Sequence, residues 1–183
     1  MYQFGLGVGL AFFAGVRTYF PLLMVGIIGR FADKFPVQPP FRFLTTLPVL
    51  LLLIALMAYE VLAERASGYA GGHALVQLGL KALAGGILFT GLFPGLGNFF
   101  GLFFGGFIAV LAHFFVISFG FPGEYQGVPF NNWKDALAVA GTVLVLLLPW
   151  LTIIIWGFLL YNLVRRSRQN TRFAAHRRSR SWR

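Results

Sequence analysis

The sequence predicts an all-α membrane protein, a bundle of about five transmembrane helices. Hydrophobic residues make up 58% of the 183 residues and charged residues only 11%, whereas a soluble domain carries about 25% charged residues. The apolar residues fall into five stretches, each close to or above the roughly 20 residues that span a hydrocarbon core. The net charge of +10 is concentrated at one end, because eight of the fifteen Lys and Arg residues lie between residues 165 and 183.

The first apolar stretch covers residues 4–28 and contains a single charge, Arg17, near its middle. An arginine at that depth costs roughly 2.5–3.5 kcal/mol on insertion scales, so it requires a partner or a water-filled cavity. Pro21 removes a backbone hydrogen bond, and together with Gly15 and Arg17 it predicts a helix that is weakened or broken near the membrane midplane. Arg17 either binds an anionic group or gates a pore, or it forms a structural ion pair and caps carbonyls of the broken helix.

The other four stretches follow at short intervals. They cover residues 43–63, 71–92, 96–119 and 136–163. We expect the first and third stretches to be interrupted or re-entrant, since the third is rich in glycine and carries Lys81. Glu60 and Glu64 lie one helical turn apart at the end of the second stretch and share a face. The two carboxylates form either a solvated helix end or a functional site that couples to protons or binds a cation. Either carboxylate is a potential partner for Arg17.

The loop charges predict the orientation of the chain. The segment 29–42 contains Arg30, Lys34 and Arg42, and loops with an excess of Lys and Arg face the cytoplasm. With five crossings, this loop and the C-terminus share the cytoplasmic side, and the N-terminus lies outside. We therefore expect a transmembrane domain over residues 1–164 and a basic cytoplasmic tail over residues 165–183.

Small residues repeat at every fourth position in two of the stretches, and residues four apart share a helix face. Such rows let helices approach closely in lipid. They predict packing within the monomer or, alternatively, an interface between copies of the chain. The candidate packing residues are Gly7, Ala11 and Gly15 in the first stretch and Gly97, Gly101 and Gly105 in the fourth.

His113 continues the row of the fourth stretch, and we expect it to bond to a neighbouring helix. A transmembrane haem usually takes two axial ligands, and His73 is the only other histidine before the tail. The chain contains no cysteine, which excludes thiolate metal sites. We therefore expect no metal and no cofactor. Asp135 is expected to serve as an anion at the N-terminus of the fifth stretch.

The tail interleaves cations with Phe173 and Trp182. Beside a membrane, each basic residue gains about 1 kcal/mol from anionic headgroups, so the bilayer is the expected partner of the tail. A protein partner is the alternative, and we do not expect nucleic acid binding. The candidate contacts are Arg165, Arg166, Arg168, Arg172, Arg177 and Arg178.

Catalytic motifs are absent from the sequence. It contains no GxxxxGK[ST] loop, no HExxH and no GxSxG. The glycines of LGVGLAFFAG do not follow a strand, so they do not form a nucleotide-binding fingerprint. We expect the protein not to be an enzyme.

Several segments resemble a bacterial family of small multipass membrane proteins that is catalogued as domain of unknown function 4126. They are GVRTYFPLLMVGIIGRF, YEVLAER, KALAGG, FFGGFIAVLAH and WKDALAV, in this order. The resemblance covers about residues 5–165, and Gly15, Arg17, Pro21 and Leu22 are its most specific element. It implies a helical membrane fold in the bacterial inner membrane and supplies no activity.

Two functions remain open. The first is a small transporter or channel-like protein with a buried site around Arg17 and Glu60, with Glu64, Lys81 and His113 as further polar candidates. The second is a non-catalytic subunit that docks into a larger membrane complex through its glycine-rich helix faces and basic tail.

Overall fold

The computed structural model describes residues 2–32, 35–65, 71–118 and 131–150, together with Thr152, Ile154, Gly157 and Tyr161. Side chains at 63–65, 71–74, 117–118 and 131–134 lie outside this description. The described chain forms six α-helices and two short 3₁₀ helices, and it contains no strand. The elements are α1 (Tyr2–Val16), α2 (Tyr19–Phe31), η1 (Pro39–Thr45), α3 (Leu47–Arg65), α4 (Gly71–Leu92), η2 (Pro94–Leu96), α5 (Asn98–Ser118) and α6 (Asn131–Leu147).

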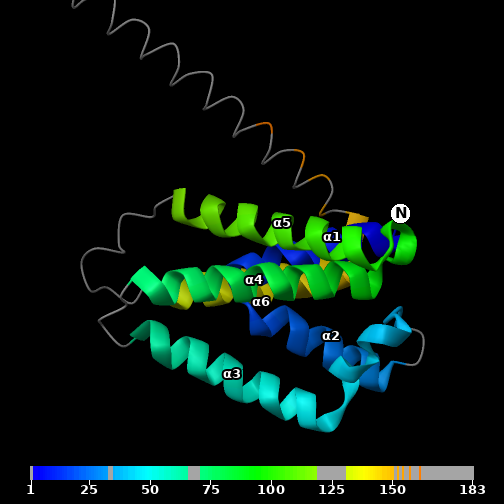
Figure 1. Ribbon diagram of the computed structural model, residues 1–183, viewed down its shortest axis with the longest axis horizontal. Coiled ribbons are helices and arrows are strands. Elements are labelled where there is room, and N and C mark those ends of the chain that lie inside the picture. The colour runs from blue at the N-terminus through cyan, green and yellow to red at the C-terminus, as the bar shows by residue number, and fades with distance from the viewer. Residues whose placement is uncertain are drawn as a thin grey trace, which may run out of the picture.

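The first apolar stretch forms two helices, because the chain breaks at Arg17 and Thr18 (Figure 1). Each helix is shorter than a membrane span, with 15 residues in α1 and 13 in α2. α1 runs antiparallel to α4, where Gly7 packs on Phe89. The packing of α2 against α3 is also antiparallel, because Gly26 lies against Leu50 at one end of α2 and Thr18 lies against Glu60 at the other.

The outer ends of α1 and α2 meet at the same end of the bundle. The Phe4 ring packs against Phe93, with ring centroids 5.4 Å apart. The backbone N–H of Gln38, which follows α2, donates to the carbonyl oxygen of Gly91 at 2.8 Å. The chain therefore enters the bundle along α1, turns at Arg17 and returns along α2. We call these two helices the re-entrant hairpin.

The re-entrant hairpin changes the predicted topology of five crossings. Two described helices, α4 and α5, are long and apolar enough to cross a membrane, and η1 with α3 makes a third span if this pair, bent by 65°, counts as one. The predicted interruption of the first stretch is present, whereas the third stretch forms the continuous helix α4. An all-helical fold is thus confirmed, and a bundle of five spans is not.

The bundle has two ends, which we call proximal and distal. The proximal end holds the start of α1, η1, η2 and the end of α6, where the Thr152 hydroxyl donates to the Gly5 carbonyl at 2.9 Å. The distal end holds the ends of α3 and α5 and the starts of α4 and α6. In Figure 1 the proximal end lies on the right. Arg30 and Arg42 therefore lie at the end of the bundle where α6 finishes.

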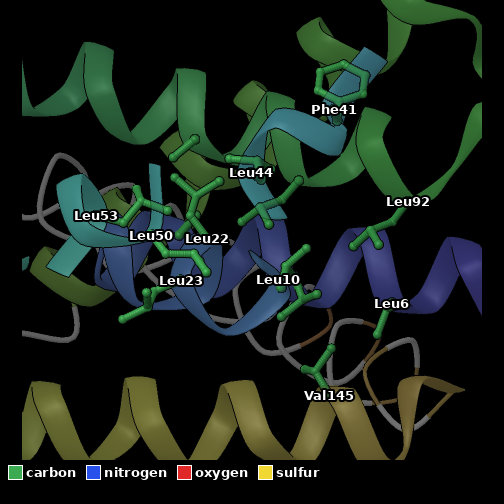
Figure 2. Close-up of a cluster of buried hydrophobic side chains, with 14 residues drawn as sticks. Leu6, Leu10, Leu22, Leu23, Phe41, Leu44, Leu50, Leu53, Leu92 and Val145 are labelled. Atoms are coloured by element: carbon green, nitrogen blue, oxygen red, sulfur yellow. The ribbon is translucent and has the colours of Figure 1, made fainter. Parts of the chain in front are cut away.

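The re-entrant hairpin lies at the centre of the hydrophobic core. Both of its arms supply buried leucines, and these meet side chains from η1, α3, α4 and α6 (Figure 2). A hairpin on the surface of the bundle would bury side chains on one side only. Apolar burial along α1 and in the middle of α2 holds the hairpin in place, which positions the polar residues at its tip. The labelled members are Leu6, Leu10, Leu22, Leu23, Phe41, Leu44, Leu50, Leu53, Leu92 and Val145.

Glycines bring α1, α4 and α5 into backbone contact. A Cβ on Gly15 would collide with the carbonyl oxygen of Ala109, and a Cβ on Gly85 would lie 2.6 Å from the Ala109 Cβ. Five of the six predicted packing residues lie at such contacts within the monomer. They are Gly7, Ala11, Gly15, Gly101 and Gly105. Gly97 is the exception, because it has a φ of 69° in the turn before α5 and nothing lies within 4 Å of a Cβ placed there.

Candidate functional site

Charged side chains gather at the tip of the re-entrant hairpin. Arg17 follows α1 directly, and its side chain is only 4% exposed. Its Nε lies 2.5 Å from Oδ1 of Asp135, which is the fifth residue of α6 and is 35% exposed. α6 runs antiparallel to α1, with Val145 packed on Gly9 and Gly141 on Phe13. This register brings the start of α6 to the break in the chain.

Thr18, the residue after Arg17, binds a second carboxylate, that of Glu60. Glu60 of α3 is 4% exposed, and its Oε1 accepts hydrogen bonds from the backbone N–H of Thr18 at 3.2 Å and from the Thr18 hydroxyl at 3.0 Å. Thr18 is the N-cap residue of α2 and makes no cap bond with its own side chain. The first N–H groups of a helix lack partners within the helix, and its positive end favours an anion. Glu60 therefore caps α2 from a neighbouring helix.

A third polar contact joins α4 and α5. The Lys81 Nζ and the His113 Nδ1 are 3.1 Å apart, within hydrogen-bond distance, and Lys81 is 5% exposed. Gly85 lies one turn after Lys81, and Ala109 lies one turn before His113. Gly15 and Gly85 both pack on Ala109, so this pair lies close to the depth of Arg17 in the bundle.

The described contacts of Arg17 include a partner that the sequence reasoning did not suggest. Glu60 and Glu64 were the expected partners of Arg17, whereas the structure pairs Arg17 with Asp135 and places Glu60 on Thr18. Asp135 was expected to be an anion at the helix N-terminus, but α6 begins at Asn131 and has no acidic residue in its first turn. The sequence reasoning assigned Asp135 no contact with Arg17. The only feature of the sequence that pointed to Asp135 was its position at the edge of an apolar stretch. The side chain of Glu64 lies outside the described residues.

The remaining predicted contacts fall outside the described part of the chain. The basic tail, with Arg165, Arg166, Arg168, Arg172, Arg177 and Arg178, is not described. In the part that is described, no group of three or more His, Cys, Asp or Glu residues lies close enough to hold a metal ion. The site built from described residues thus consists of Arg17, Asp135, Thr18, Glu60 and the Lys81–His113 pair.

This arrangement is suited to binding an ion. Taking a charged group out of water is expensive, and a buried ion pair often contributes little net stability. The pair here joins an enclosed guanidinium to a carboxylate that is partly exposed. Arginine presents several N–H donors in a rigid fork that matches carboxylate geometry. The site can therefore hold an anion on Arg17 or exchange one anion for another without moving the guanidinium.

Comparison with known proteins gives one match. No curated protein and no solved structure matches the chain. The sequence profile of a family described as "Domain of unknown function (DUF4126)" matches residues 4–169. That range includes all but the first two residues of the re-entrant hairpin and every charged residue of the site. By this match, which covers most of its length, the chain belongs to the DUF4126 family.

Proposed function

We propose that this protein is a small multipass membrane transporter or channel-like protein, and that its solute site is the tip of the re-entrant hairpin. The observation that carries the proposal is the Arg17–Asp135 pair, in which the arginine is 4% exposed and the aspartate 35% exposed. A purely structural charge pair is as easily built from two enclosed groups or two exposed ones. This one joins an enclosed guanidinium to a partly exposed carboxylate.

The break in the chain supports this function in a second way. Half-helices that end inside a membrane protein direct their terminal backbone groups toward a central site, and transporters bind solutes at such ends. Irregular backbone at membrane depth is tolerated where it is buried in protein or lines a cavity. Arg17 and Thr18 form such a break, and Glu60 fixes the start of α2. A solute that reaches Arg17 from the distal end would then pass only if α1, α2 or α6 moved.

Flux measurements on the purified protein in liposomes test this function. Arg17→Ala should abolish flux of the transported solute while the protein remains folded in the membrane. The matched control is Arg30→Ala, because Arg30 is an exposed arginine of α2 whose Nη1 donates to the Thr45 carbonyl oxygen at 3.1 Å. Unchanged flux in a folded Arg17→Ala variant would refute a role for Arg17 in transport.

A charge exchange separates a transport role from a structural one. The double variant Arg17→Asp with Asp135→Arg restores an ion pair at the same place. If the pair only stabilises the fold, this variant should regain both stability and flux. If Arg17 acts on the solute, the variant should regain stability while flux stays lost, because an arginine on α6 presents its guanidinium to the water-facing side.

The second candidate, a subunit of a larger membrane complex, is favoured by one surface. Phe99, Phe103 and Phe107 form an exposed row along α5. They line a groove of about 500 Å³ between α4 and α5, whose floor includes Gly86 and Gly106. Purification in a mild detergent should then recover a stoichiometric partner. Replacement of these three phenylalanines by bulky polar residues should abolish its recovery. Recovery of the chain alone or as a homo-oligomer would count against this candidate.

A further inference from the structure

We infer that the groove between α4 and α5 binds one acyl chain of a membrane lipid, which enters from the proximal end of the bundle. The groove has a volume of about 500 Å³, and every residue that lines it is apolar. Its ligand is therefore hydrocarbon rather than a headgroup or an ion. Gly86 lines the groove, whereas its neighbour Gly85 packs toward Ala11 of α1. The groove thus lies on a different face of the helix pair from the re-entrant hairpin, and it is separate from the proposed solute site.

The shape of the groove follows from the residues on its two sides. Its floor lies where the two helices touch, because a Cβ on Gly86 would lie 2.5 Å from the Leu102 carbonyl oxygen. A Cβ on Gly106 would likewise lie 2.9 Å from the carbonyl oxygen of Ala82. Leu83 forms the wall on α4 and is 62% exposed. The wall on α5 is the phenylalanine row, formed by Phe99, Phe103 and Phe107.

The length of the groove matches one leaflet of a bilayer. On α5 its lining begins at Phe99, the second residue of the helix, and ends at Val110, near the middle. At about 1.5 Å per residue, this stretch covers about 16 Å, and half of a hydrocarbon core is about 15 Å thick. α4 and α5 are also the two described helices that are long and apolar enough to cross a membrane. A chain in the groove therefore has its ester end beside Phe99 and its methyl end beside Val110.

The width of the groove favours a single acyl chain over a helix of a partner protein. The volume of about 500 Å³, divided by a length of about 16 Å, gives a mean cross-section of about 30 Å². A helix with its side chains is about 10 Å across and needs roughly 80 Å². A methylene group takes about the volume of a water molecule, roughly 30 Å³, so the groove holds about 16 of them. This number corresponds to a chain of the palmitoyl class.

Packing rather than the hydrophobic effect holds the chain in the groove, because lipid tails are as apolar as the residues that line it. A chain between the phenylalanine row, Leu83 and the glycine floor contacts protein on three sides. A chain beside Leu51, on the exposed surface of α3, contacts protein on one side. Dispersion contacts are individually small and add up with their number. We therefore expect one slowly exchanging lipid per protein, in addition to the lipids that surround the bundle.

Photolabelling of the full chain in a mild detergent with two phosphatidylcholines tests this inference. Both lipids carry a diazirine on a palmitoyl chain, one near the ester end and the other near the methyl end. Peptide mass spectrometry should find the first label around Phe99 and the second around Val110. Labelling should saturate at one lipid per protein, and excess unlabelled palmitoyl lipid should suppress it. Labelling at Leu51 of α3 should not saturate.

A filled groove provides the matching variant. Ala82→Phe places a ring among the lining residues and should abolish the saturable labelling. Leu80→Phe is the control, because Leu80 is exposed on the same helix and does not line the groove. Thermal unfolding shows whether both variants are folded. If Ala82→Phe folds poorly, the positions labelled by the two lipids in the unmodified protein decide the question without it.

The possible results separate this inference from the proposed function. Labelling of the same positions by both lipids would overturn it, as would equal saturable labelling of a folded Ala82→Phe variant and the unmodified protein. Recovery of a protein that covers the phenylalanine row in place of the lipid would overturn it as well. None of these results bears on flux through the hairpin tip. Conversely, unchanged flux in Arg17→Ala would refute the transport role of Arg17 and leave the lipid in the groove.

Discussion

Arg17 and Thr18 are consecutive residues, and they bind carboxylates on two different helices. Arg17 contacts Asp135 of α6, and Thr18 donates two hydrogen bonds to Glu60 of α3. In a continuous helix, the backbone N–H of Thr18 would donate to a carbonyl oxygen of the same helix. The break in the chain therefore makes this donor available to Glu60. These two adjacent residues thereby connect the break between α1 and α2 to α6 and to α3.

Removal of the Thr18 hydroxyl tests this contact. Thr18→Val keeps the shape of the side chain and leaves Glu60 with one described donor instead of two, so it should lower the free energy of unfolding by about 1–3 kcal/mol. Thr18→Ser keeps the hydroxyl and serves as the matched control. Denaturant titration in detergent provides the measurement. Equal stability of the two variants would contradict a role for this hydrogen bond.

At the scale of single residues, the sequence identified the buried charge of Arg17 but not its contact with Asp135. Arg17 could be recognised because it is the only charged residue in a long apolar stretch. Asp135 could not be recognised as its partner, because the pairing depends on α6 running antiparallel to α1. That register is set by contacts such as Gly9 with Val145, which connect residues far apart in the chain and leave no local pattern.

The re-entrant hairpin explains why helix direction was harder to predict than helix position. The break was predicted from Gly15, Arg17 and Pro21, and it lies at residues 17–18. The reversal of direction was left open, because the sequence allowed the first stretch to be either interrupted or re-entrant. Residues 1–16 contain no Lys, Arg, Asp or Glu, so the charge rule for loops gives no information on the side at which the chain begins.

The packing of α4 against α1 and α5 depends on Gly85. A Cβ at this position meets the Ala109 Cβ at 2.6 Å and the Gly105 carbonyl oxygen at 2.7 Å. Gly85→Ala should therefore force helices apart and lower the stability by about 1–3 kcal/mol. Gly79→Ala lies on the same helix with nothing within 4 Å, and it should be neutral or slightly stabilising because alanine favours helix. Thermal unfolding of both variants is the measurement, and an equal loss of stability in both would contradict close packing at Gly85.

For the molecule as a whole, the structure makes a direct prediction about sidedness. The chain contains no cysteine, so single cysteines can be introduced without a background. Tyr2→Cys and Leu96→Cys lie at the proximal end, and Asn131→Cys lies at the distal end. A membrane-impermeant maleimide should label the first two from one side of the membrane and the third from the other. Five crossings would instead place Tyr2→Cys and Leu96→Cys on opposite sides.

Arg17 and Asp135 lie far apart in the sequence, and this has a consequence for biosynthesis. The first apolar stretch leaves the ribosome before any of the helices that enclose it, and it carries its arginine from the start. Asp135 is synthesised only after α3, α4 and α5, so the ion pair forms once α6 has begun to insert. We therefore expect the earliest segment of the chain to reach its final position last. Nascent chains that stop before residue 131 should be retained by the insertion machinery or degraded, whereas those that include α6 should be released as folded protein.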